Sequence, residues 1–314
     1  MTRHVVFGSG QIGGHVASQL LDSGQEVFVV SRTGRTVPTG ARAITGDLTN
    51  AEFATTAADD AGVIYFCLNA PNYHSWPKEF PPLQRAAVHA ATRVGVRLVV
   101  LENLYSYGPT GGRTLTEDLP ANATSAKALT RIAMTNELLE AHSRGTLDVT
   151  IGRASDFFGP GVTQSALGEQ VMRPALMGKR AQVVGNPHKR HSYSYTPDVA
   201  KGLIALGTTQ APSGEIWHLP IAETLTTREF VDAIYTAANH PTRLTAAGRT
   251  ALALLGLVKP ELRELRHTLY QFTEHWVVDD TKFRTTFGDL STPLTTAIES
   301  TLLWYRNNPA KESS

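Results

Sequence analysis

The residues whose types and spacing most clearly indicate a chemical role lie near the start of the chain, where Gly8, Gly10 and Gly13 form the pattern G-x-G-x-x-G. An apolar run precedes them and an amphipathic run follows, which predicts a strand, a tight turn and a helix. In such a turn the first glycine permits the bend, the second lets the backbone approach a pyrophosphate, and the third lets helix and strand pack closely. The helix N-terminus then offers N–H groups to phosphate oxygens. The pattern predicts dinucleotide binding by Gly8, Ser9, Gly10, Gln11, Ile12 and Gly13; the alternative is an ordinary tight turn.

A second feature with chemical meaning follows the next predicted strand, at 26–30. That strand runs into Ser31-Arg32-Thr33-Gly34-Arg35. A site that prefers NAD places an acidic residue here to bind the ribose 2′-hydroxyl, whereas a guanidinium suits a 2′-phosphate. We therefore predict NADP(H) as the cofactor, bound in part by Ser31 and Arg32. The alternative is that Arg32 is a solvated loop cation.

Further candidate contacts follow the other predicted strands. Asp47 comes after a short strand at 41–45, and its carboxylate suits either the adenine amino group or a helix N-cap. Because parallel strands present their carboxyl ends at one edge of a sheet, residues that follow different strands converge there. The remaining predicted cofactor contacts are Asp47, Leu48, Asn69, Ala70, Pro71, Lys127, Ala154 and Ser155.

The elements that must position these residues alternate along the first half of the chain. Strands are predicted at 5–7, 26–30, 41–45, 62–68, 96–101 and 147–153, and helices after the glycine turn and at 83–94 and 126–143. This alternation predicts an α/β fold, a doubly wound parallel sheet of the Rossmann type. Beyond Gly161 the periodicity changes. There we predict helices at 167–178, 192–206, 227–238, 280–287 and 295–305, a mostly helical stretch at 245–276, and short strands at 181–184 and 216–220.

The change of pattern predicts two parts. Residues 1–160 and about 192–220 are expected to form an NADP-binding Rossmann domain. Residues about 161–191 and 221–314 are expected to form a smaller, mainly helical substrate cap. The basic stretch 188–191 holds two histidines without a neighbouring carboxylate or cysteine, so we predict a surface loop and no metal site.

Composition excludes several classes of protein. The chain of 314 residues carries a net charge of only +1. It therefore lacks the excess of basic residues that would favour binding to nucleic acid or to an anionic membrane. No apolar run reaches about 18 residues, the length of a membrane span. One cysteine, Cys67, excludes an intrachain disulfide framework. With no secretory leader visible, we expect a cytoplasmic monomer or homodimer that binds a small-molecule substrate.

Several short motifs, found along nearly the whole chain, together match the pattern of one protein family. They are the glycine turn, Gly46-Asp47-Leu48, Tyr107-Gly108-Pro109, Thr116-Glu117-Asp118, Arg153 with Phe158-Gly159-Pro160-Gly161, and Tyr195-Thr196-Pro197-Asp198-Val199-Ala200. With them the sequence resembles the extended short-chain dehydrogenase/reductase superfamily, also called the NAD-dependent epimerase/dehydratase family. Extended members usually open with G-x-x-G-x-x-G, so the G-x-G-x-x-G found here is similar to the atypical branch. The resemblance implies a Rossmann fold and a nicotinamide cofactor.

The catalytic positions depart from that family's pattern. Asn103 stands where the family has Ser or Thr, and Lys127 and Arg131 stand where it has the Tyr and Lys of Tyr-x-x-x-Lys. A shift that puts Lys127 in the Lys position leaves Ala123 in the Tyr position. In the family that Tyr transfers a proton, helped by the charge of the Lys. The usual Ser-Tyr-Lys mechanism therefore cannot run unchanged in this chain.

The substitute catalytic candidates are Asn103, Tyr105, Lys127 and Arg131. Lys127 or Arg131 would stabilise a developing oxyanion, and Asn103 would supply an amide donor. The proton would come from Tyr105, Lys127, water or a substrate hydroxyl. The alternative is that Lys127 and Arg131, one helical turn apart, are solvated or pair with Glu117 or Asp118.

Three functional hypotheses follow. The first is an NADPH-dependent reductase of a ketone or enone in a hydrophobic small molecule, since hydride transfer mainly needs the nicotinamide held close to the acceptor carbon. This pattern also resembles tetrad-lacking ketoreductases of angucyclinone antibiotic pathways, which implies a polycyclic aromatic ketone. The second is a non-catalytic NADP(H)-binding regulator, similar to nitrogen-regulation relatives that lost the tyrosine. The third is a sugar epimerase or dehydratase with substitute residues.

The predicted substrate pocket lies between the sheet edge and the cap. Its aromatic and apolar groups favour an uncharged hydrophobic substrate over a nucleotide sugar. Tyr73, His74 and Trp76 are expected to form a lid; the alternative is that Trp76 and Phe80 simply pack the loop. The predicted substrate contacts are Tyr73, Trp76, Tyr105, Asp156, Phe157 and Phe158.

Overall fold

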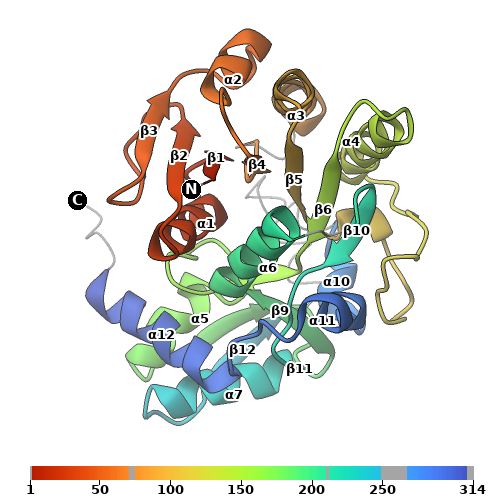
Figure 1. The fold of residues 1–314 in the computed structure, drawn as a ribbon. Helices are drawn as coiled ribbons and strands as arrows, with labels where there is room; N and C mark the ends of the chain where they lie inside the picture. The colour runs from red at the N-terminus through yellow and green to blue at the C-terminus, as the bar shows by residue number, and fades with distance from the viewer. Residues whose placement is uncertain (1, 71–74, 210–211, 249–266, 310–314) are drawn as a thin grey trace.

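The computed structural model describes residues 2–70, 75–209, 212–248 and 267–309. Its centre is a seven-stranded sheet in the order β10-β6-β5-β4-β1-β2-β3, in which every pair of neighbouring strands is parallel (Figure 1). The predicted doubly wound sheet is therefore confirmed. Its strands are β1 (Arg3–Phe7), β2 (Glu26–Ser31), β3 (Arg42–Thr45), β4 (Val63–Phe66), β5 (Arg97–Glu102), β6 (Val149–Arg153) and β10 (Glu215–His218).

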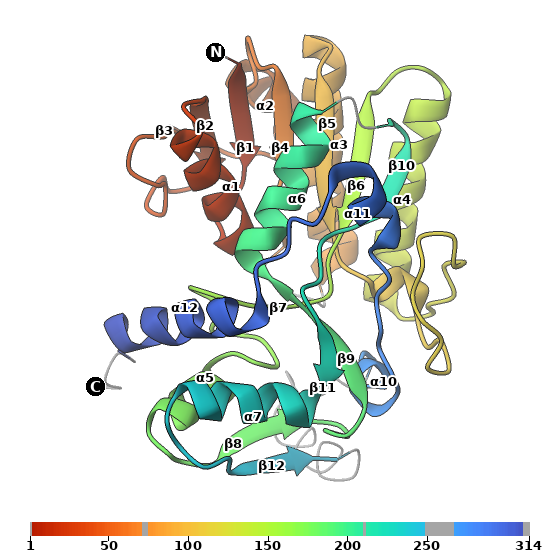
Figure 2. The same cartoon turned by 60° about the horizontal axis from the view of Figure 1, so that its bottom comes forward.

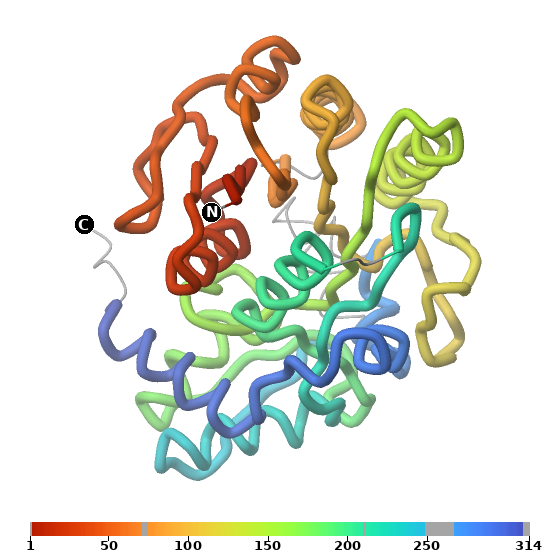
Figure 3. The backbone as a smooth tube through the Cα atoms, viewed as in Figure 1, coloured from red at the N-terminus to blue at the C-terminus, as the bar shows by residue number. Residues whose placement is uncertain are grey.

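Helices cover both faces of this sheet, because its central strands are apolar on both sides. Residues 5, 7, 28 and 30 pack toward α2 (Ala51–Ala57), α3 (Trp76–Val94) and α4 (Ala126–Ser143). Residues 6, 27 and 29 pack toward α1 (Gln11–Asp22) and α6 (Thr196–Thr208). The tube in Figure 3 follows the chain through these two layers. No helix in the described part of the chain combines the length and apolar character needed to cross a membrane.

The second part of the molecule lies beyond the carboxyl ends of the strands (Figure 2). It contains a three-stranded sheet, β11-β9-β7, formed by β7 (Asp156–Phe158), β9 (Arg190–Tyr195) and β11 (Thr224–Thr226). A parallel pair joins β8 (Ala181–Val184) to β12 (Leu244–Ala247). A separate core packs these strands against α5 (Glu169–Leu176), α7 (Thr227–Ala237) and α12 (Leu294–Asn307). The short elements η2 (Tyr105–Tyr107), α10 (Tyr270–Thr273) and α11 (Thr281–Phe287) complete the described fold.

Three local predictions need correction. The stretch expected to be mostly helical from Thr245 begins inside β12, which pairs with β8; residues 249–266 of it lie outside the described residues. The helix expected from Ser192 begins only at Thr196, because the preceding residues form β9. The expected surface loop at 188–191 is wrong at its end, since Arg190 and His191 also belong to β9 and His191 is buried.

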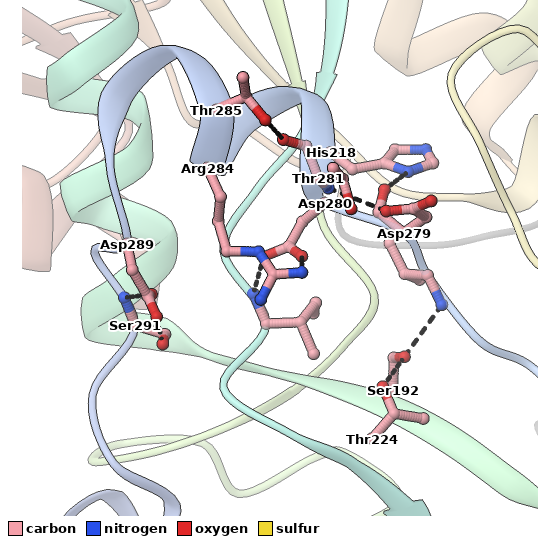
Figure 4. A network of polar contacts seen from close by, with 12 residues as sticks. Ser192, His218, Thr224, Asp279, Asp280, Thr281, Arg284, Thr285, Asp289 and Ser291 are labelled. Atoms are coloured by element: carbon pink, nitrogen blue, oxygen red, sulfur yellow. Dashed lines mark hydrogen bonds and ion pairs between the residues drawn. The ribbon is translucent and has the colours of Figure 1, made fainter.

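A polar network connects the segment before α11 to β9 and to the end of β10 with the residues that follow it (Figure 4). The Asp280 carboxylate accepts a hydrogen bond from Ile221 N at 3.0 Å and pairs with Arg284 at 3.1 Å. The Ser192 hydroxyl accepts from Val278 N at 2.9 Å and is 2.6 Å from the Thr224 hydroxyl. Strand residues from both parts of the molecule are thus connected through one C-terminal segment.

The closest backbone approach in the glycine turn is at Gly13. A Cβ atom at Gly13 would lie 2.0 Å from Gly8 O and 3.0 Å from Gly8 C, both backbone atoms. A Cβ atom at the neighbouring Gly14 would meet nothing within 4 Å. Packing of α1 against the turn therefore requires glycine at 13 but not at 14.

We predict opposite effects for alanine at these two positions. Gly13→Ala forces the turn apart and should lower the free energy of unfolding by about 1–3 kcal/mol, as overpacking does. Gly14→Ala should leave stability unchanged or raise it by up to ~1 kcal/mol, because alanine favours the helix. Urea unfolding of the cofactor-free protein followed by circular dichroism measures both. Equal stability of the two variants would contradict the close packing at Gly13.

Candidate functional site

The glycine turn connects β1 to α1 at the centre of the sheet's carboxyl edge. Gly8 has a φ of +109°, a conformation that side chains disfavour, and its N–H donates to Val30 O at 2.9 Å. Gly10 is the N-cap of α1, and no acidic residue stands in the first turn of that helix. A Cβ at Gly10 would meet no protein atom within 4 Å, so packing within the protein does not explain this glycine. An open backbone at a helix N-terminus fits the pyrophosphate of a dinucleotide.

The loop after β2 folds back onto this turn. The Thr36 hydroxyl donates to Ser9 O at 3.0 Å and lies 2.7 Å from the Ser9 hydroxyl. The Ser31 hydroxyl accepts from Gly34 N at 3.0 Å, which shapes the loop between them. Arg32 is exposed at the loop's start. The sequence alone does not indicate Thr36 as a site residue, because only the folded loop brings it to Ser9.

Residues after the other strands reach the same edge, as predicted from the parallel order. The Asp47 carboxylate is exposed and accepts from Thr49 N at 2.9 Å. That contact with Thr49, and more weakly the Arg32 charge, lower the pKa of Asp47. The N-cap of α2 is Asn50 rather than Asp47. Of the remaining predicted cofactor contacts, Leu48, Ala70, Ala154 and Ser155 are buried and Asn69 is exposed; Pro71 lies outside the described residues.

A buried ion pair joins the ends of β5 and β6. Glu102 and Arg153 are register neighbours, and Arg153 Nε lies 3.0 Å from Glu102 Oε2. Thr135 of α4 donates to the other Glu102 oxygen at 2.7 Å. The Arg153 guanidinium also lies 4.9 Å from the centre of the Tyr107 ring. Burial alone would lower the pKa of Arg153, but the charges of and hydrogen bonds with Glu102 and Tyr107 together outweigh it and the pKa is raised.

Tyr107, which follows β5, extends this network to β10. Its hydroxyl lies 2.8 Å from His218 Nε2, and His218 Nδ1 donates to Asp279 O at 2.9 Å. Because Nδ1 carries the proton, Nε2 accepts from the tyrosine. Burial lowers the pKa of His218 and raises that of Tyr107. Tyr107 thus acts as a structural link, which leaves Tyr105 as the tyrosine of this segment nearer to the predicted site.

Tyr105 and Lys127 lie next to one another. Lys127 Nζ is 5.3 Å from the centre of the Tyr105 ring. Asn103 Oδ1 accepts from Tyr105 N at 3.1 Å, so the Asn103 side chain holds the turn and retains its amide NH₂ as a donor. Lys127 stands in the first turn of α4 and is buried. The alternative of a solvated Lys127 is therefore wrong.

Arg131 and Trp76 pack against each other away from solvent. The Arg131 guanidinium lies 4.2 Å from the centre of the Phe80 ring and 5.2 Å from that of Trp76. Trp76 is 0 % exposed, and its indole N–H donates to Ala70 O at 3.1 Å. Trp76 therefore packs the loop, which was the alternative to a lid. Arg131 supports this packing, and its catalytic role stays a prediction; Tyr73 and His74 lie outside the described residues.

Asp156 begins β7, immediately after the end of β6. Its Oδ2 lies 2.9 Å from Nε2 of His191, a buried residue of β9 at the end of the stretch expected to form a surface loop. Phe157 is partly buried, whereas Phe158 is buried against Tyr195 and Phe230 in the core of the second part. Phe158 is thus unsuited to contact a substrate. The described residues contain no cluster of three or more His, Cys, Asp or Glu able to hold a metal ion.

Comparison with solved structures relates the whole described fold to sugar-nucleotide enzymes. DesIV, a dTDP-glucose 4,6-dehydratase from Streptomyces venezuelae solved with NAD, is 19 % identical with a TM-score of 0.77, covering 98 % of each chain. The UDP-glucose 4-epimerase of Thermus thermophilus, also solved with NAD, is 19 % identical with a TM-score of 0.75, covering 98 % of this chain and 100 % of that one. At this identity the likeness establishes the shared fold. No curated protein sequence matches the chain.

Comparison with protein families supports a relationship beyond the shared fold. The model of the NAD dependent epimerase/dehydratase family matches residues 5–219, which include the glycine turn, most of β1 and every other strand of the large sheet. This match supports a nicotinamide-dependent enzyme, and it favours the epimerase or dehydratase hypothesis over the ketone reductase. The matched residues make up more than half of the sequence, and the chain therefore belongs to the NAD dependent epimerase/dehydratase family.

Proposed function

We propose that this protein is an oxidoreductase that binds NADP(H) and promotes hydride transfer at an oxygen-bearing carbon of a small molecule. The observation that carries the proposal is the open glycine turn with the Ser9–Thr36 loop folded over it and Arg32 at the end of β2. When bound, the nicotinamide supplies or accepts the hydride. Hydride transfer is common to reductases, epimerases and dehydratases that use this cofactor.

The preference for NADP(H) rests on charge and hydroxyl groups. The loop at 31–36 offers the hydroxyls of Ser31 and Thr36 and the cations Arg32 and Arg35, without a carboxylate of its own. A guanidinium binds a phosphate dianion with charge-assisted hydrogen bonds, whereas a carboxylate would repel it. The related solved enzymes carry NAD, so we propose that this chain differs from them in cofactor preference.

The proton-handling residues that we propose are Tyr105, Lys127 and Asn103. The Lys127 ammonium favours negative charge that develops on the substrate oxygen, and the Asn103 amide is a second donor at the same edge. The Tyr105 hydroxyl is the proposed proton donor or acceptor, with the Lys127 charge 5.3 Å from its ring. Arg131 acts as a positioning residue through Trp76 and Phe80.

Two reaction classes remain, each supported by a different observation. The family match and the sugar-nucleotide enzymes among the similar structures support an epimerase or dehydratase. The replacement of the family's Tyr-x-x-x-Lys by Lys127 and Arg131 supports a reductase of a ketone or enone. A reductase needs one hydride and one proton, whereas epimerisation and dehydration also need a base that works in both directions.

We predict that Arg32→Ala weakens NADPH binding about tenfold or more and changes NADH binding less than about twofold. The physical reason is that only NADPH presents a 2′-phosphate. Fluorescence titration of both cofactors measures the effect. Arg93→Ala, which removes an exposed arginine from the C-terminal turn of α3, is the matched control. Equal losses for NADPH and NADH would contradict the role of Arg32.

The two reaction classes differ in what happens to the cofactor. A reductase should consume one NADPH per product molecule, whereas an epimerase or dehydratase should regenerate the cofactor in each turnover. The test is a panel of aromatic ketones, enones, UDP-glucose and dTDP-glucose. We predict that a compound in this panel gives product with either one NADPH consumed per product molecule or no net NADPH consumption. NADPH absorbance measures the cofactor, and chromatography measures the product. Tight NADPH binding without product from any compound would favour the non-catalytic regulator instead.

Once a substrate is found, Lys127→Ala should lower kcat by about 10²-fold, the loss typical of one oxyanion-stabilising donor. Lys78→Ala, which removes an exposed lysine from the first turn of α3, should leave kcat unchanged. Steady-state kinetics at saturating NADPH separates kcat from any effect on cofactor affinity. An unchanged kcat in Lys127→Ala would assign oxyanion stabilisation to another group.

A further inference from the structure

One face of α1 carries three polar side chains, Gln11, His15 and Gln19, each four residues after the last. Residues at this spacing lie one above the other on a helix. Two of them donate to backbone carbonyl oxygens outside the helix: Gln11 Nε2 to Gly161 O at 3.0 Å, and Gln19 Nε2 to Pro197 O at 2.9 Å. The polar face of the helix that begins at the glycine turn is therefore bound to other segments of the chain.

His15, between the two glutamines, makes a third contact of the same kind. Its side chain is hydrogen-bonded to the backbone of Pro160. Proline has no backbone N–H, so the acceptor is the Pro160 carbonyl oxygen. Burial lowers the pKa of His15, so the ring is neutral and one of its N–H groups donates. Two adjacent carbonyls after β7 are thus bound by the first two turns of α1.

These carbonyls belong to the turn at 159–162, where the chain leaves β7 for the second part of the molecule. Consecutive carbonyl oxygens of this turn accept hydrogen bonds, from residue 159 to residue 162, from Val162 N, His15, Gln11 and the Tyr305 hydroxyl. Tyr305 belongs to α12, so the turn lies between α1 and α12 (Figure 2). It therefore connects the cofactor helix directly to the second part.

The turn is also packed closely against the start of α6. Gly159 has a φ of +141°, and a Cβ atom there would lie 2.3 Å from Thr196 Oγ1 and 3.3 Å from Thr196 N. Thr196 is the first residue of α6 and is buried. Contacts with α1, α6 and α12 together fix the place of the turn. This packing also gives a physical reason for the glycine in the motif Phe158-Gly159-Pro160-Gly161.

Gln11 differs from the other two donors in its place on the helix. It directly follows the N-cap Gly10, so its backbone N–H is one of the groups that face a pyrophosphate bound at this terminus. Its side chain is exposed, and a single hydrogen bond there is opposed by the entropy of ordering a long side chain. A phosphate that fixes the Gln11 backbone lowers this entropic cost and strengthens the bond to Gly161.

We propose that Gln11 is a positioning residue that couples NADP(H) binding at the glycine turn to the order of the turn at 159–162. This inference rests on the proposed function, since it assumes that NADP(H) binds at the N-terminus of α1. The Gln11 backbone N–H serves the cofactor, whereas the side chain holds Gly161. Because coupling between two sites is reciprocal, the contact with Gly161 also increases NADP(H) affinity.

Hydrogen–deuterium exchange of the peptide covering residues 159–168, with and without saturating NADPH, tests the coupling. In the wild type NADPH should slow this exchange by about two- to tenfold, the range that one neutral hydrogen bond supplies. Gln11→Met keeps the length of the side chain and removes its donor, so the protection should disappear. Protection of this peptide in Gln11→Met equal to that in the wild type would overturn the proposal.

Gln19→Met is the matched control, because it removes the same kind of bond from the same helix, two turns from the glycine turn. It should keep the full NADPH-dependent protection of residues 159–168. His15→Leu removes the other donor from α1 without touching the helix N-terminus, and it should reduce the protection. Circular dichroism verifies that each variant folds. Loss of protection in Gln19→Met equal to that in Gln11→Met would contradict a specific role of Gln11.

NADPH affinity provides a second measurement. By reciprocity, the Kd of Gln11→Met should rise by about the factor of protection that is lost, whereas that of Gln19→Met should not change. Fluorescence titration gives both values, and a Kd unchanged in Gln11→Met would refute the coupling. Wild-type protein that binds NADPH without protection of residues 159–168 would reject the coupling alone. Wild-type protein that does not bind NADPH would reject the proposed function and the coupling together.

Discussion

The ion pair between Glu102 and Arg153 is the contact on which the carboxyl edge of the sheet depends. Both side chains are buried, so each charge would cost several kcal/mol if the other were absent. Further contacts surround the pair: Thr135 donates to Glu102, and the Arg153 guanidinium faces the Tyr107 ring. Because the partners stand at the last register positions of β5 and β6, their distance fixes where the segments after those strands begin. Those segments carry Asn103, Tyr105, Ser155 and Asp156.

The same pair couples the large sheet to the rest of the chain. Tyr107 bonds to His218 at the end of β10, and His218 bonds to the backbone of Asp279 just before α11. The backbone N–H of His218 donates to Glu117 at 2.9 Å, which adds the loop before α4. A network of this kind is stabilising only when all its members are bonded, so its buried charges favour one arrangement of the four segments over others. The edge that holds the proposed cofactor and substrate positions is therefore rigid at its base.

The sequence predicted the parts of this architecture that depend on neighbouring residues. Apolar runs indicate the strands of the large sheet, so β1 to β6 were predictable. The turn at Gly8, Gly10 and Gly13 was also predictable, because the role of glycine in a tight turn depends on the local sequence alone. The second sheet was not, because β9 reads as polar and its burial comes from distant partners. His191 is buried by Asp156, 35 residues before it, and by the 271–272 backbone and ring, 80 or more residues after it. The environment of Trp76 and Arg131 could not be predicted from the sequence for the same reason. Packing between α3 and α4 decides whether such side chains face a ligand or the core.

The two ends of the proposed site differ in charge. Arg32 and Arg35 lie in the loop after β2, at the proposed cofactor end, whereas Asp156 stands at the start of β7, directly after β6. Cationic groups at the first end attract the phosphates of a dinucleotide. In the proposed complex, these cations favour a dinucleotide with its adenosine half toward β2. The fold thus brings the candidate site residues to one edge of the sheet, and function is argued from the chemistry of those residues rather than from the fold.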